Sequence, residues 1–116
     1  MNISERAKNL QDQMVAWRRD LHRIPELGLI LPKTAKYVMD RLDEMGIAYQ
    51  TYEGHSGIVA TIGHGDGKVV AIRADMDALA IEEETGLEYA SQNFSLPSFS
   101  PSFLPSLLLG AAKMFK

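Results

Sequence analysis

The sequence predicts an α/β fold in which two N-terminal helices are followed by the strands of a mixed sheet. Two apolar stripes with helical spacing run through residues 3–45, and three β-rich stretches separated by glycine turns follow over residues 47–73. The chain has 116 residues, enough for one small domain and too few for two. Helices and then strands in this order are typical of the opening of a larger α/β sheet domain.

The first helix is predicted over residues 3–24. Ser4 is placed to cap its start, and Pro25 ends it because the residue before a proline is disfavoured in helical geometry. We expect Trp17 and Leu21 to lie in the core. The apolar stripe has spacings of four and three: Ile3, Ala7, Leu10, Met14, Trp17, Leu21 and Ile24.

The second helix is predicted from Pro32 to Met45, with Gly46 as a left-handed cap and Val38 and Leu42 in the core. Strands are expected at residues 47–52, 58–62 and 68–73. The centre of the third strand is continuously apolar, which predicts burial on both faces and places Val70 and Ile72 in the core.

The composition excludes several classes of protein. A net charge of −3 without a basic patch gives no reason to expect a nucleic-acid partner, and the absence of cysteine excludes disulfides and thiolate metal sites. The N-terminal residues carry charges where a signal peptide needs an apolar core, so a cytoplasmic protein is expected. Residues 92–112 lack charge, but three prolines and many serines argue against a membrane helix.

The composition changes after Ser91 and divides the chain into three parts. Residues 1–91 read as the well-formed part, and residues 92–107 are a low-complexity Ser/Pro/Phe segment, in which residues 94–105 are expected to be irregular. Residues 108–116 read as a short helical C-terminus.

Asp75 and Asp77 are the best candidates for chemistry. They follow the third strand at positions i and i+2, so their side chains should project to the same side, at the strand end where α/β sheets bind ligands. Two carboxylates there can coordinate a divalent cation or orient a histidine that does so. The alternative is that the two aspartates only cap the following turn.

The other polar residues have structural interpretations. His22 lies on the flank of the first apolar stripe, where histidine packs or caps, and His55 and His64 lie in glycine-rich hairpin turns. The run Glu82–Glu84 is typical of a solvated surface. No Ser-His-Asp or Cys-His arrangement can be argued.

Taken together, two segments resemble one family. Residues 17–28, WRRDLHRIPELG, are similar to the opening signature of the N-acyl-amino-acid amidohydrolases, the group of hippurate and auxin-conjugate hydrolases within the aminoacylase-like metallopeptidases. Residues 71–79, AIRADMDAL, resemble its second signature, which continues through residues 83–91. The resemblance covers residues 1 to about 93 and resumes at residues 108–113.

The resemblance implies the start of a zinc-peptidase-like catalytic domain that hydrolyses the amide bond of N-acyl amino acids. In that family a pair of divalent metals, zinc, manganese or cobalt, activates water, with a glutamate from later in the chain as general base. Asp77 corresponds to the aspartate that orients a metal-binding histidine in related peptidases. Asp75 occupies the place of that histidine, and whether it is a metal ligand stays open.

The departures from the family pattern concern the metal. Between residues 93 and 108 the family carries a cysteine–glycine–histidine–aspartate motif with two metal ligands, whereas residues 94–107 here contain no cysteine, histidine, aspartate or glutamate. We therefore expect a truncated, inactive piece, and metal binding by this chain alone is not expected. The alternative is a non-catalytic piece that docks on a full-length relative. Self-association through an exposed sheet edge is also expected.

Overall fold

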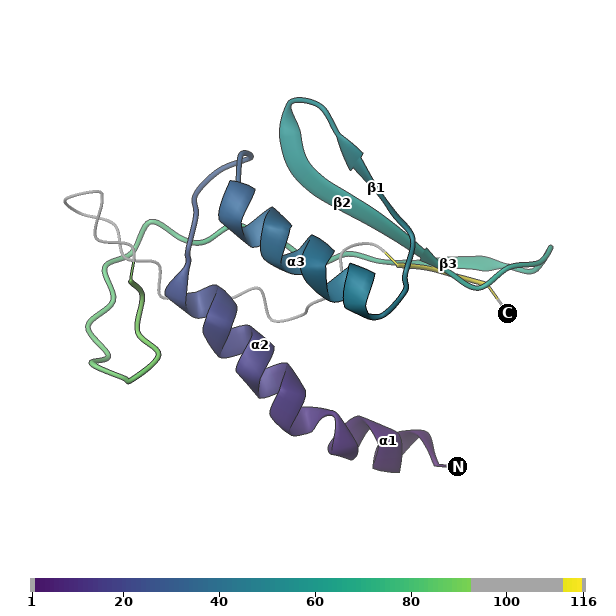
Figure 1. The fold of residues 1–116 in the computed structure, drawn as a ribbon, viewed down its shortest axis with the longest axis horizontal. Helices are drawn as coiled ribbons and strands as arrows, with labels where there is room; N and C mark the ends of the chain where they lie inside the picture. The colour runs from purple at the N-terminus through teal and green to yellow at the C-terminus, as the bar shows by residue number, and fades with distance from the viewer. Residues whose placement is uncertain (1, 93–111, 116) are drawn as a thin grey trace.

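A computed structural model describes residues 2–92 and 112–115 and shows, within them, three helices and a four-stranded sheet (Figure 1). The predicted α/β class is confirmed. Among the described residues, no helix is long and apolar enough to cross a membrane. The elements are α1 (Ile3–Asn9), α2 (Gln11–Arg23), α3 (Pro32–Glu44), β1 (Tyr49–Tyr52), β2 (His55–Ile62), β3 (Val69–Ile72) and β4 (Ala112–Phe115).

The sheet is mixed, as predicted, with the strand order β1-β2-β4-β3. β1 and β2 form an antiparallel hairpin, and Gly54 in its turn has φ 82°, a left-handed conformation that glycine adopts without strain. β4 pairs parallel with β2 and antiparallel with β3. The last strand in sequence therefore lies inside the sheet and joins the hairpin to β3.

The core lies between α3 and the β1–β2 hairpin, with α3 running across the face of the sheet (Figure 1). The helical stripe of α3 meets alternate residues of β2, because side chains two apart on a strand share a face. The buried cluster consists of Ala35, Val38, Leu42, Ile58 and Ala60. Ile47, Tyr49, Met39 and Met76 pack against it, partly buried.

The link between α2 and α3, residues 24–31, is fixed by side chains at both of its ends. The Glu26 carboxylate accepts hydrogen bonds from the N–H groups of Lys33 (3.1 Å) and Thr34 (2.7 Å), two of the amides that the first turn of α3 leaves unpaired. The Leu31 N–H donates to Ser56 Oγ at 2.7 Å. The link thus holds α3 in place over the start of β2.

The predicted first helix is interrupted. Leu10 separates α1 from α2, and Asn2, not Ser4, provides the cap, because its Oδ1 accepts from the Ser4 N–H at 3.1 Å. α1 has no buried residue, and Ile3 is 85% exposed. The regular apolar spacing continues through the break, but no residue of α1 is buried, so burial adds little to the stability of a helix of only seven residues.

The prediction that β3 is buried on both faces is wrong. Val70 is 57% exposed, and Ile72 is only half-buried. α3 packs on β2, so the described helices leave β3 uncovered. Of the other predicted core residues, Leu21, Val38 and Leu42 are buried and Trp17 is half-buried.

The helical C-terminus predicted for residues 108–116 is also wrong in its described part. Residues 112–115 form β4 and bond to strands on both sides. A strand in that position satisfies its backbone through two neighbours, which outweighs the modest local preference for helix. The low-complexity segment 92–107 lies, from Asn93 onward, outside the described residues.

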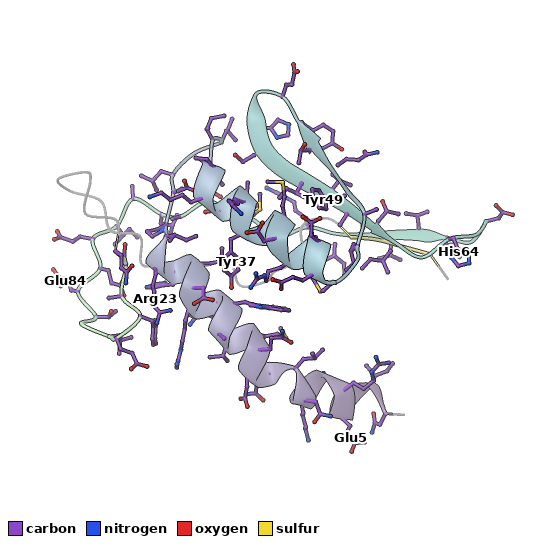
Figure 2. The ribbon with its side chains drawn as sticks, in the orientation of Figure 1. Glu5, Arg23, Tyr37, Tyr49, His64 and Glu84 are labelled. Carbon is purple, nitrogen blue, oxygen red and sulfur yellow. The ribbon has the colours of Figure 1, made fainter. Side chains whose placement is uncertain are left out.

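A polar contact joins α2 and α3, and Figure 2 shows Tyr37 between the two helices. The Tyr37 hydroxyl donates to Asp20 Oδ2 at 2.8 Å, and Arg23 Nη1 donates to the other oxygen of the same carboxylate at 3.0 Å. Burial, with the hydrogen bond and charge of Asp20, raises the pKa of Tyr37 from 10.0 to about 12.

We predict that Tyr37 ionises at a higher pH than an ordinary tyrosine does. Asp20→Asn should lower the pKa of Tyr37 but not as far as 10.0, because the hydroxyl remains part-buried. The folded-state pKa lies above the unfolded one, so the stability linked to Tyr37 is present below pH 10 and is lost as pH rises toward about 12. Phenolate absorbance, assigned with Tyr37→Phe, measures the pKa. The matched control is Asp12→Asn, which changes an exposed aspartate of α2. If Asp12→Asn lowered the pKa of Tyr37 as much as Asp20→Asn, the prediction would be contradicted.

Candidate functional site

The segment that carries Asp75 and Asp77 continues from β3 without strand pairing among the described residues. Burial alternates along it: Ile72, Ala74, Met76 and Ala78 are half-buried, whereas Ala71, Arg73, Asp75 and Asp77 are exposed. An alternation with period two is that of an extended backbone, so both aspartates project to the same, solvent-facing side.

The two aspartates do not by themselves make a metal site. Asp75 Oδ1 accepts from Arg73 Nη2 at 2.8 Å, and both side chains are largely exposed, so this carboxylate has a cation beside it already. No three histidine, cysteine, aspartate or glutamate side chains converge among the described residues. The described residues therefore do not bring together the three protein ligands that a catalytic zinc ion takes.

His64 lies in a turn, as the sequence predicts, whereas His55 is the first residue of β2, directly after the hairpin turn. His55 Nδ1 accepts from the Gly57 N–H at 3.0 Å, and its ring stacks on Tyr52 with the centroids 5.4 Å apart. His64 is exposed in the turn between β2 and β3 (Figure 2). His55 organises the β1–β2 turn, and neither histidine approaches the two aspartates closely enough to form a described group of ligands.

A buried pair of ionisable side chains lies elsewhere, at the end of α2. His22 Nε2 is 2.9 Å from Glu83 Oε2, with 9% and 2% of the two side chains exposed. The Ser91 N–H donates to the same oxygen at 2.8 Å, and the Thr85 hydroxyl donates to the other. The Tyr89 ring meets the His22 ring edge-on, with centroids 5.9 Å apart. Residues 61 positions apart are thereby joined.

The electrostatics of Glu83 follow from these contacts. Burial by itself acts to raise the pKa of Glu83, but the hydrogen bonds from Thr85 and Ser91, together with His22, outweigh burial and hold the pKa below its usual value. The carboxylate is therefore ionised at neutral pH although water scarcely reaches it. Such a group is stable only while its partners remain in place.

The sequence reading of Glu82–Glu84 as a solvated run is wrong for the middle residue. Glu82 and Glu84 are exposed, and only Glu83 turns inward. Three adjacent glutamates carry no periodicity that distinguishes the middle one, and its partners are distant in sequence. The one available signal is that His22 and Glu83 lie in the two separate segments that resemble the amidohydrolases.

Comparison with known proteins defines the class. The chain is 40% identical to the N-acyl-L-amino acid amidohydrolase of Geobacillus stearothermophilus over 96% of its own length and 32% of that protein. It is 39% identical to IAA-amino acid hydrolase ILR1-like 5 of Arabidopsis thaliana over 90% of the chain and 24% of the relative. The N-acetyl-L-cysteine deacetylase of Bacillus subtilis (strain 168) is 38% identical over 92% and 26%.

The resemblance predicted from the two signatures is thus confirmed: the chain is related to the N-acyl-amino-acid amidohydrolase group over most of its length. It spans about a quarter to a third of these curated relatives. No protein-family profile matches the chain. No solved structure matches it.

We predict that Asp75→Asn changes the free energy of unfolding by no more than about 0.5 kcal/mol, because its ion pair with Arg73 is exposed. Urea denaturation measures the change. The matched comparison is Asp20→Asn, which weakens part-buried hydrogen bonds to Tyr37 and Arg23 and should cost about 1 kcal/mol or more. If Asp75→Asn costs as much, then Asp75 has a structural role.

Proposed function

We propose that this chain is the N-terminal part of the catalytic domain of a metal-dependent amidohydrolase that cleaves the amide bond of N-acyl amino acids. The observation that carries the proposal is the match to proteins named as N-acyl-L-amino acid amidohydrolase and IAA-amino acid hydrolase at about 40% identity over nine-tenths or more of the chain. The exposed, same-side placement of Asp75 and Asp77 after β3 agrees with it, because both remain accessible to further groups.

In this proposal Asp77 orients a metal ligand, and whether Asp75 binds the metal itself stays open. A divalent ion, when bound, would activate water for attack on the amide carbonyl. No group of ligands for that step converges among the described residues, and residues 93–107 contain no cysteine, histidine, aspartate or glutamate. We therefore propose that the 116-residue chain alone is inactive.

We predict no hydrolysis of hippurate or other N-acyl amino acids by the purified chain with added zinc, manganese or cobalt. The physical reason is that no described group of side chains can hold the ion that polarises water and carbonyl. Release of the free amino acid is the measurement. Turnover that co-purifies with the chain and disappears in Asp77→Ala would contradict the inactivity.

A chimera supplies the matched positive control. Residues 1–92 of this chain would replace their counterparts in the Geobacillus stearothermophilus amidohydrolase, which contributes the remainder of its own sequence. The chimera should hydrolyse N-acyl amino acids, and Asp77→Ala should abolish that activity without unfolding the protein. A folded but inactive chimera would count against the proposed function.

A second candidate function is non-catalytic association through the sheet edge at β3, and the exposure of this strand favours it. Val69 and Val70 are 45% and 57% exposed, and Ile62, which is 40% exposed, shares a β4 register position with Val70. An apolar edge strand invites pairing with another chain, either a second copy or a full-length relative.

We predict that the purified chain associates as its concentration rises and that Val70→Lys weakens the association, since a lysine blunts an apolar edge. Sedimentation velocity measures the effect. The control is Val15→Lys, which places the same charge on α2, where Val15 is 37% exposed. A strictly monomeric wild-type chain, or equal weakening by both variants, would contradict association through β3.

A further inference from the structure

The segment of residues 79–92, here called the return loop, begins and ends beside the same short stretch of chain. At its start the Ala78 N–H donates to the Glu26 carbonyl at 2.8 Å, and at its end the Gln92 N–H donates to the Arg23 carbonyl at 3.0 Å. The loop contains no helix or strand and lies beside the C-terminal end of α2 (Figure 1). Its path therefore depends on individual contacts, not on a regular backbone ladder.

The return loop carries one glutamate, Glu83, whose side chain is buried. Its side chain is 2% exposed, whereas Glu82, Glu84 and Glu88 are exposed, and Figure 2 shows Glu84 at the outer rim of the loop. Removing a carboxylate from water is costly unless hydrogen bonds and charge replace its hydration. The loop adopts this arrangement only because partners for Glu83 converge on it.

Those partners come from both sides of the contact. His22, on the last turn of α2, is the partner from outside the loop, and the Thr85 hydroxyl and Ser91 N–H are partners from within it. One carboxylate thus connects the helix, the middle of the loop and the loop's end. The Tyr89 ring, which also belongs to the loop, packs edge-on against His22.

We propose that Glu83 is a positioning residue, whose carboxylate fastens the return loop to α2 through His22 and so holds the adjoining segment that carries Asp77. Asp77 directly precedes Ala78, which is bonded to the link at Glu26, and the return loop starts one residue later. If the loop were released from α2, the described segment beside Asp77 would be held only by this backbone hydrogen bond and by the packing of Met76 against the core. Only the importance given to Asp77 rests on the proposed function; the fastening itself does not.

The charges around Glu83 make the fastening sensitive to acid. From α2, His22 faces the carboxylate directly, while Arg19 lies 4.6 Å over the Tyr89 ring and 3.8 Å from Glu88. The pKa of Glu83 is lower in the folded chain, so its stabilising contribution is present above the ordinary carboxyl range and is lost as pH falls through the folded-state value. The loop should detach in acid before the core of α3 and β2 unfolds.

The test compares Glu83→Gln with Glu84→Gln in the full chain, by amide hydrogen exchange and NMR. Glu83→Gln keeps the size and an acceptor oxygen but removes the charge, and should speed exchange at Ala78, Ser91 and Gln92 by about tenfold or more while β2 stays protected. Glu84→Gln, the exposed neighbour, should leave all of these amides unchanged. The Ser91 amide shift should follow acidification in the wild type and stay flat in Glu83→Gln.

Two outcomes would overturn the proposal. Unchanged exchange at Ala78 and Ser91 in Glu83→Gln would show that the loop is held without the carboxylate. A Ser91 shift that follows acidification equally in the wild type and in Glu83→Gln would show that Glu83 is not the group that titrates. If Glu83→Gln does not fold, His22→Gln is the second variant, and it should speed exchange at the same amides while the Ser91 shift still follows acidification, because the Glu83 carboxylate remains. None of these measurements depends on catalysis. The test of the fastening and the chimera test of the proposed function can therefore fail independently of each other.

Discussion

The short link between α2 and α3 is the constraint on which the other parts of the structure depend. The Glu26 carboxylate caps α3, and the Glu26 carbonyl receives the Ala78 amide, so one residue fixes both the helix over the core and the segment that follows β3. Leu29 and Leu31 bond to Ser56 at the start of β2. Residues distant in sequence therefore meet at one point, and disturbing the link would displace a helix, a hairpin and a candidate site together.

The parts of the fold that the sequence predicts correctly are those whose stabilising contacts are local or periodic. α3 has a proline start, an apolar stripe and Gly46 at φ 67°, and the structure shows the helix and the cap as predicted. The β1–β2 hairpin similarly follows from its glycine turn and strand-forming residues. Each of these elements has its signal within a few residues of the structure it forms, so pattern alone is sufficient.

The errors arise where distant partners decide the outcome. The stripe of the first helix is regular, yet no residue of α1 is buried, so regular spacing did not produce burial. Val70 is apolar and exposed for the same reason. Residues 112–115 become a strand because β2 and β3 lie on either side with free backbone groups, a circumstance that the local sequence cannot reveal.

The candidate site shows the same division between local pattern and distant partner. Asp75 and Asp77 were found because strand geometry relates i to i+2, and their common side follows from that alone. Glu83 was missed because its burial depends on His22, Ser91 and Thr85, of which only Thr85 is close in sequence. The exposed aspartates need no partner to be stable and so remain available for further ligands, whereas Glu83 cannot be ionised and buried without its contacts. The two exposed aspartates lie eight and six residues before Glu83 on one continuous segment. Under the proposed fastening, the order of the segment that carries them depends on the contacts that Glu83 makes with the rest of the chain.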